Sequence, residues 1–240
     1  IEAPKSPYIG KDVGDVLKIG SLGVKVIGSD KLEEELQKKK PAFLVEFTNP
    51  EATVQNVKVA AANKVGVIVG TTGLSKGQTA EIEEAIKRNK VAGMISSNFS
   101  IGMNVMFKMA EDAARTLKGY DIEIIEAHHR FKKDAPSGTA MTLAKTMSAA
   151  LGRDLDKVGV YGRKGMTGER RPDEIGIHAI RAGDIAGEHT VLFGALGERM
   201  EIKYQAHSRD AFARGCVIAI KWMAGKKPGL YEMKDVIGLK

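Results

Sequence analysis

Short apolar runs alternate with amphipathic stretches along the first part of the chain. Strands and helices that alternate in this way, with short turns, are typical of a parallel sheet covered by helices. The pattern therefore predicts a Rossmann-like α/β domain, whose ligands gather at the carboxyl ends of the strands. The expected strands are 24–27, 43–47, 65–69 and 91–95, and the expected helices are 30–39, 52–63 and 75–89.

The pattern changes after Ile101, and the remaining elements predict a second domain of α+β type with a mixed or antiparallel sheet. Residues 175–182, 189–193 and 200–205 alternate like an antiparallel meander with one solvent-facing side. We place the first domain at 1–99 with 210–240 and the second at 100–209. The other expected elements are helices at 102–117, 139–151 and 210–224 and a half-buried strand at 120–126.

The segment from Glu126 to Ala140, EAHHRFKKDAPSGTA, carries more chemistry than any other stretch. It joins the expected strand 120–126 to the expected helix 139–151. Imidazoles such as those of His128 and His129 suit proton transfer and carboxylate binding. Because neighbouring ammonium groups disfavour each other's charge, Lys132 or Lys133 is a candidate proton donor.

The same segment ends in Ser137-Gly138-Thr139, which opens a helix. Free backbone N–H groups and the helix dipole bind anions there, either a carboxylate or a phosphate. The alternative is a solvated strand end beside an ordinary helix cap. The residues alone leave both interpretations open.

Polar or glycine-rich turns follow three expected strands of the first domain. Their sequences are FTNP at 47–50, GTTG at 70–73 and SSNF at 96–99. Glycines let a ligand approach the backbone and hydroxyls supply hydrogen bonds, so the three turns together suit a nucleotide. Each turn alone is also an ordinary turn.

Composition narrows the class of protein. The chain has 240 residues, 43% of them hydrophobic, and a net charge of +7, which favours anionic ligands. Only 5% of residues are aromatic, so base-stacking surfaces and nucleic-acid binding are not expected. No apolar run approaches the ~20 residues of a membrane span. The single cysteine, Cys216, lies in an apolar helical pattern, which indicates a buried thiol and a cytoplasmic protein, and no histidine spacing predicts a metal site.

Taken together, several motifs closely resemble the dihydrodipicolinate reductase family. They are EAHHRFKKDAPSGTA, VGTTG, SSNFSIGMNV, RAGDIAGEHTV and GLYEMKDVIGL. The resemblance implies reduction of 4-hydroxy-tetrahydrodipicolinate or dihydrodipicolinate to tetrahydrodipicolinate by NADH or NADPH, in lysine and diaminopimelate biosynthesis. It also implies a dinucleotide-binding first domain, a second domain for substrate and oligomerisation, and a homotetramer formed through the meander.

The resemblance also assigns roles to residues of the second domain. His128 matches the catalytic histidine and Lys132 the proton-donating lysine. The substrate carboxylates would be held by His129, Lys132, Ser137, Gly138 and Thr139. Phe131 stands where the family can have a further histidine.

The cofactor residues implied by the resemblance lie at the strand ends and near residue 1. They are Glu2, Ala3, Lys5, Phe47, Thr48, Gly70, Thr71, Thr72, Ser96, Ser97, Asn98 and Phe99. The sequence departs from the family at its start, because the glycine-rich turn that cradles the pyrophosphate is missing. We expect a fragment of a longer chain, and Glu2, Ala3 and Lys5 leave the choice between NADH and NADPH open.

Three other functions compete with this interpretation. A reductase-derived oligomeric binding module would have impaired cofactor binding. Another nicotinamide enzyme, such as an amino-acid dehydrogenase, would not need this arrangement of histidines, lysine and Ser-Gly-Thr. RNA binding rests on net charge alone.

Overall fold

The computed structural model describes residues 1–239, which form two compact units. The first unit comprises Ile1–Ile95 and Trp222–Glu232, and the second comprises Ser96–Lys221 and the residues from Met233. Residues 96–99, 210–221 and those from 233 on, all expected in the first domain, fall in the second unit. The reason is close packing: a Cβ on Gly215 would lie 1.8 Å from the Phe99 carbonyl oxygen, so the two backbones touch.

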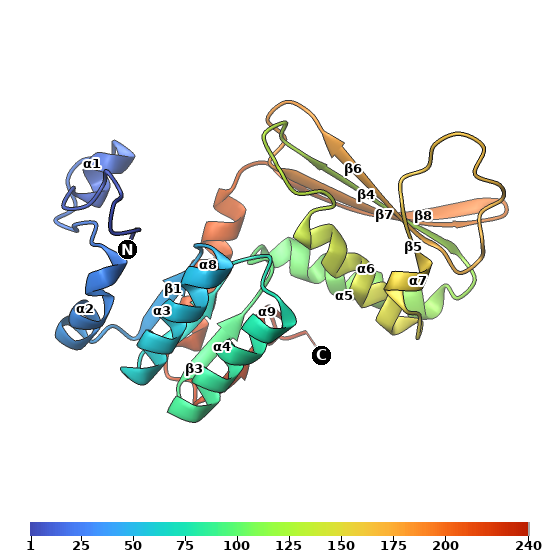
Figure 1. Cartoon of the computed structure of the whole chain (residues 1–240). Coiled ribbons are helices and arrows are strands. Elements are labelled where there is room, and N and C mark those ends of the chain that lie inside the picture. The colour runs from blue at the N-terminus through green and yellow to red at the C-terminus, as the bar shows by residue number, and fades with distance from the viewer. Residues whose placement is uncertain (240) are drawn as a thin grey trace. The chain divides into compact units, whose positions relative to one another are not determined.

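The first unit is built on a parallel four-stranded sheet of order β1-β2-β3-β9 (Figure 1). Helices α3 and α4 pack against each other beside this sheet. Local signals start both helices, since Asn49 caps α3 and Ser75 and Gln78 form a capping box at α4. The strands are β1 (Phe43–Glu46), β2 (Gly66–Val69), β3 (Ala92–Ile95) and β9 (Gly229–Tyr231), and the helices that follow η1 (Ser29–Lys31) are α2 (Leu32–Lys39), α3 (Pro50–Ala62) and α4 (Lys76–Asn89).

The expected strand at 24–27 is wrong. Apart from α1 (Val13–Leu17), the segment before η1 pairs only through isolated bridges, Glu2 with Gly28 and Asp12 with Lys25. The segment around 24–28 therefore pairs with two different short segments, and neither pairing continues into a regular ladder of hydrogen bonds between strands.

The second unit contains a five-stranded sheet of order β5-β6-β4-β7-β8. The expected meander is wrong, because β4 lies between β6 and β7 and pairs in parallel with β6. The strands are β4 (Asp121–His128), β5 (Gly159–Tyr161), β6 (Ile175–Arg181), β7 (Gly187–Ala195) and β8 (Glu198–Ala206). The helices are α5 (Ile101–Thr116), α6 (Gly138–Ala150), α7 (Leu155–Val158), α8 (Asp210–Met223), which runs on into the first unit, and α9 (Met233–Val236).

Helices α5 and α6 pack together on one face of this sheet (Figure 1). Ile122 and Ile124 of β4 point into the core beneath them and are almost fully buried. Side chains two apart on a strand share a face, so Glu126 and His128 continue the same row. The covered face of the sheet thus ends in ionisable residues. No helix in the described part of the chain is long and apolar enough to cross a membrane.

Candidate active site

Strand register alone gathers four ionisable side chains at the end of the covered face. Glu126 pairs with His189 on β7, and His128 pairs with Arg181 on β6. Paired residues of neighbouring strands point to the same side of a sheet, so all four lie together. We call this group the Glu126 cluster.

Glu126 is the centre of the cluster and is 0% exposed. Its Oε1 accepts hydrogen bonds from the Ser137 backbone N–H (3.0 Å) and Arg181 Nη2 (2.8 Å). Its Oε2 accepts from His128 Nδ1 (2.5 Å) and Arg181 Nη1 (2.8 Å). Burial alone would raise the pKa of Glu126, but the hydrogen bonds from His128, Arg181 and Ser137 outweigh burial and lower this pKa to about 2.

The ionised Glu126 decides which nitrogen of His128 carries a proton. A carboxylate can only accept hydrogen bonds, so His128 Nδ1 must be the donor. Nε2 is then left for another partner. A Cβ on Gly187 would lie 3.2 Å from this Nε2, so the missing side chain leaves room beside it.

His189 packs edge-on against His128, with ring centroids 5.3 Å apart. It is 3% exposed, and its Nε2 lies 3.2 Å from Ser137 Oγ. Burial and the positive charge of His128 lower the pKa of His189 to about 4. His189 is therefore neutral near neutral pH, and its Nδ1 has no hydrogen-bond partner among the described residues.

Cationic side chains border the cluster. Lys132 Nζ lies 2.8 Å from Asp134 Oδ1, and Arg181 Nη2 donates to the Asp134 carbonyl oxygen (2.6 Å). Arg209 Nη2 donates to His129 Nε2 (3.3 Å). The side chains expected to hold carboxylates, His129 and Lys132, are thus joined by a further cation that the sequence did not single out.

The first turn of α6 differs from the expectation at Ser137. This residue is 2% exposed, its N–H binds Glu126, and its Oγ accepts the Ala140 N–H (3.2 Å) as a helix cap. Its polar groups are therefore occupied within the chain. The N–H groups of Gly138 and Thr139 make no hydrogen bond among the described residues and remain open to an anion.

The segment expected beside the nicotinamide reaches the same turn. Asn98 Nδ2 donates to Thr139 Oγ1 (3.1 Å), and Ser97 Oγ lies 3.2 Å from Thr142 Oγ1. Ser96 bonds to the Asn98 carbonyl through its hydroxyl. The ring of Phe99 is 1% exposed and serves the core of the second unit, so only its backbone could meet a ligand.

In the first unit, the expected cofactor residues Phe47 and Thr48 follow β1, and Gly70 to Thr72 follow β2. Phe47 is 53% exposed, and its ring covers Gly70, where a Cβ would lie 2.1 Å from a ring carbon. An exposed ring at the carboxyl ends of parallel strands fits a base or ribose of a dinucleotide. The hydroxyl of Thr71, however, is buried against Thr53 (2.7 Å), whereas Thr72 is exposed.

Glu2, Ala3 and Lys5 are exposed in the first unit. Glu2 is held by its backbone, which donates to the Ile27 carbonyl and accepts from the Ser29 N–H, both at 2.9 Å. The backbone of Glu2 is therefore held in place while its carboxylate stays accessible to solvent. No group of three metal-ligating side chains gathers among the described residues.

Comparison with known proteins shows the family of the chain. The model for "Dihydrodipicolinate reductase, N-terminus" matches residues 1–99, and that for "Dihydrodipicolinate reductase, C-terminus" matches residues 102–237. The chain belongs to the dihydrodipicolinate reductase family. It is similar to the 4-hydroxy-tetrahydrodipicolinate reductases of Methanocaldococcus jannaschii, with 52% identity over 99% of this chain and 86% of the relative, and of Methanosarcina mazei, with 51% identity over 96% and 86%.

Solved structures agree with this membership. A dipicolinate-bound dihydrodipicolinate reductase from Paenisporosarcina sp. TG-14 is similar with a TM-score of 0.70 and 27% identity, over 95% of this chain and 86% of that one. An amine dehydrogenase from Mycobacterium smegmatis matches with a TM-score of 0.57 at 14% identity, over 94% and 85%, which shows a shared fold alone. The α/β fold class expected from the sequence is confirmed.

Four further residues lie at the candidate site and were not expected there from the sequence, namely Glu126, Arg181, His189 and Arg209. Glu126 had a visible signal, because it continues the apolar row of Ile122 and Ile124 on β4. A lone acid on the buried face of a strand needs partners. Arg181 and His189 lie in the motif RAGDIAGEHTV, which carried the resemblance but was given no site role, and Arg209 has no local signal.

Proposed function

We propose that this chain reduces 4-hydroxy-tetrahydrodipicolinate, or its dehydrated form dihydrodipicolinate, to tetrahydrodipicolinate in lysine and diaminopimelate biosynthesis. The observation that carries the proposal is the Glu126 cluster beside an open helix start, in a member of the dihydrodipicolinate reductase family. A small cyclic dicarboxylate needs both cations and N–H donors, and this site offers both.

The carboxylates of the substrate would bind the Gly138 and Thr139 N–H groups, His129 and Lys132, with Arg209 as a further cation beside His129. Ser137 caps the helix and so stabilises the helix start to which Gly138 and Thr139 belong. His128 presents Nε2 and Lys132 its ammonium, and both can donate a proton to the reduced ring. Arg181 and Asp134 hold the loop that carries Lys132.

A bound NADH or NADPH supplies the hydride in this reaction. The residues proposed to contact it are Phe47, Thr48 and the backbone of Gly70 to Thr72 in the first unit, with Glu2, Ala3 and Lys5 at the adenosine end. Thr71 would act through its backbone, because its hydroxyl is buried. Ser96, Ser97, Asn98 and the Phe99 backbone would lie beside the nicotinamide.

The direct test is oxidation of NADH and of NADPH by the purified chain, with and without freshly prepared dihydrodipicolinate. We expect substrate-dependent loss of reduced-nicotinamide absorbance. Binding of each dinucleotide is measured separately by calorimetry. Dinucleotide binding without turnover would contradict the proposed reaction, and absence of both would support a binding module with impaired cofactor binding.

We also propose a homotetrameric assembly and a cytoplasmic location. Ile180 of β6 is 47% exposed and pairs with Ala127, on the face of the sheet that α5 and α6 do not cover, which supports a partner on that face. Light scattering coupled to size exclusion tests the assembly. A monomer at micromolar concentration would contradict the tetramer.

A further inference from the structure

We infer that Glu126 and Arg181 form a positioning pair, which fixes the proton of His128 on Nδ1 and ties the Lys132 loop and the α6 start to the same carboxylate. This inference rests on the proposed function for its effect on turnover. Neither residue is proposed to touch the substrate. Their role is to hold the groups that do.

The carboxylate of Glu126 has no freedom left to turn. Each of its oxygens accepts two hydrogen bonds, and the donors come from β4, β6 and the start of α6. The Arg181 fork binds both oxygens at 2.8 Å, a bidentate geometry that fixes the plane of the carboxylate. A fixed plane fixes the position of the His128 ring, because Nδ1 must follow Oε2.

The tautomer of His128 follows from the same contact. With Nδ1–H held by Glu126, the neutral ring presents an unprotonated Nε2, and the protonated ring presents Nε2–H. The proton that leaves His128 in the reaction is therefore always the one on Nε2. Without the Glu126 carboxylate, the neutral ring can carry its proton on either nitrogen.

Arg181 also connects the Glu126 carboxylate to the loop after β4. Its Nη2 binds Glu126 Oε1 and, at 2.6 Å, the carbonyl oxygen of Asp134. The carboxylate of Asp134 in turn pairs with Lys132 at 2.8 Å. One guanidinium thus sets the distance between the two proposed proton donors, His128 and Lys132.

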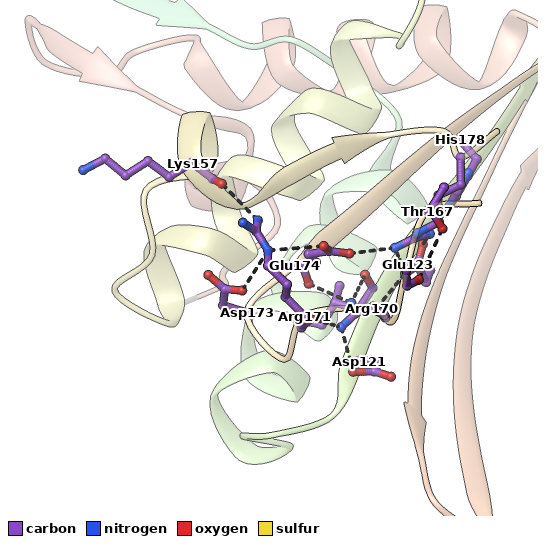
Figure 2. A network of polar contacts seen from close by, with 12 residues as sticks. Asp121, Glu123, Lys157, Thr167, Arg170, Arg171, Asp173, Glu174 and His178 are labelled. Carbon is purple, nitrogen blue, oxygen red and sulfur yellow. Dashed lines mark hydrogen bonds and ion pairs between the residues drawn. The ribbon is translucent and has the colours of Figure 1, made fainter. Parts of the chain in front are cut away.

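The same strand offers a matched control on its other face (Figure 2). Glu123 also binds an arginine fork, with Arg163 Nη1 and Nη2 both at 3.0 Å, and a histidine, with His178 Nε2 at 2.7 Å. Arg170 Nε adds a further bond at 2.9 Å. We call Glu123, Arg163, Arg170 and His178 the Glu123 cluster. It resembles the Glu126 cluster in chemistry and has no proposed role in catalysis.

The experiment compares Glu126→Gln and Arg181→Lys with Glu123→Gln and Arg163→Lys in the full chain. Turnover and KM are measured with NADH and dihydrodipicolinate, and the ring nitrogens of the histidines are followed by NMR after ¹⁵N-histidine labelling. We expect Glu126→Gln to lower kcat about 10- to 100-fold with little change in the KM for NADH. It should also mix the tautomers of His128 while leaving His178 protonated on Nε2.

Arg181→Lys should leave the His128 proton on Nδ1, because Glu126 remains ionised. It should raise the KM for the dicarboxylate, since a lysine cannot hold Glu126 and Asp134 in one fork. Glu123→Gln should release the tautomer of His178 and keep kcat within about two-fold. If Glu126→Gln fails to fold, Arg181→Lys and the wild-type tautomer of His128 carry the test.

The inference is overturned if Glu126→Gln keeps kcat as well as Glu123→Gln does. It is also overturned if neutral wild-type His128 carries its proton on Nε2. Because the tautomer is read without substrate, a wild-type chain that binds dinucleotide but does not turn over would contradict the proposed function alone.

Discussion

Two glutamates three positions apart on β4 are surrounded by the same kinds of side chain, yet they face opposite sides of the sheet. Glu126 lies on the covered face beside the start of α6 and is 0% exposed. Glu123 lies on the other face, where its side chain is 18% exposed. Burial raises the pKa of both glutamates, but hydrogen bonds outweigh burial and lower each pKa to about 2. The donors are Arg163, His178 and Arg170 at Glu123, and His128, Arg181 and Ser137 at Glu126.

The two clusters differ in which nearby hydrogen-bonding groups remain available to a ligand. Every partner of the Glu123 carboxylate among the described residues is a side chain, and Arg170 also binds Asp121 and three backbone carbonyls, those of Arg171, Ile122 and Glu174. Each histidine binds its glutamate through a single ring nitrogen, but only the Glu126 cluster adjoins a helix start, where the N–H groups of Gly138 and Thr139 make no hydrogen bond among the described residues. The lowered pKa is common to both glutamates and therefore does not by itself distinguish the proposed site from the Glu123 cluster.

The largest effect should come from exchanging the histidines. We expect His128→Gln to lower kcat by about 100-fold or more, because a general acid is lost. His178→Gln, the matched change in the Glu123 cluster, should leave kcat within about two-fold. Steady-state kinetics with dihydrodipicolinate measures both, and equal losses would abolish the contrast between the clusters.

A loss of stability should dominate on the other face. Arg170→Met removes the hydrogen bonds to Glu123 and to nearby carbonyls and leaves a partly buried carboxylate with fewer partners. We expect the free energy of unfolding to fall by about 2 kcal/mol, with kcat per folded molecule unchanged. Urea unfolding followed by circular dichroism measures the free energy of unfolding. Retained stability would mean that the Glu123 cluster is dispensable for folding.

The clusters should also separate by pH. Burial and the charge of His128 lower the pKa of His189 from 6.5 to about 4, so the unfolded chain binds more protons than the folded one between these values. Stability is therefore lost as pH falls from about 6.5 to about 4. His189→Gln should flatten this part of the stability curve.

The two glutamates have lowered pKa values, so their contribution is present above their ordinary pKa and is lost as pH falls from 4.5 toward 2. Glu123→Gln should reduce that lower-pH loss without affecting the window of His189. Urea midpoints measured at a series of pH values test both statements. An unchanged slope between pH 6.5 and 4 in His189→Gln would contradict the first of them.

The smallest effects are expected at the rims of the clusters. Asp134 and Asp173 have exposed side chains and pair with Lys132 and Arg171, respectively. Either change to Asn should alter the free energy of unfolding by less than ~0.5 kcal/mol, because solvent screens exposed pairs. Only Asp134→Asn should raise the KM for the dicarboxylate, by about two- to five-fold, as Lys132 loses its partner. Equal KM values in the two variants would contradict the proposal that Lys132 binds the dicarboxylate.

The sequence predicted those parts of the fold that local signals determine. Helix α6 begins after its Ser137 cap and is followed by Gly152, and both signals are visible in the chain. Strand β9 was missed because three residues form a strand there only by pairing with β3. The placement of β4 between β6 and β7 was missed for the same reason, since strand neighbours are chosen by non-local packing.

The candidate site divides in the same way. The motif from Glu126 to Ala140 gave His128, His129, Lys132 and the helix start through resemblance, and their roles stay predictions. Arg181 and His189 enter through register across β4, which the sequence does not display. The occupied state of Ser137 could not be read from a motif, because it depends on where Glu126 points.

Gly176 on β6 pairs with Glu123, and a Cβ there would lie 1.7 Å from Glu123 Oε2. The carboxylate thus occupies the volume in which a neighbouring side chain would stand. Position 176 is consequently coupled to position 123 in the sequences that this sheet can accept. A larger residue at 176 is compatible with the fold only when the acid at 123 is shortened or removed, so the two positions should vary together in any library selected for folding.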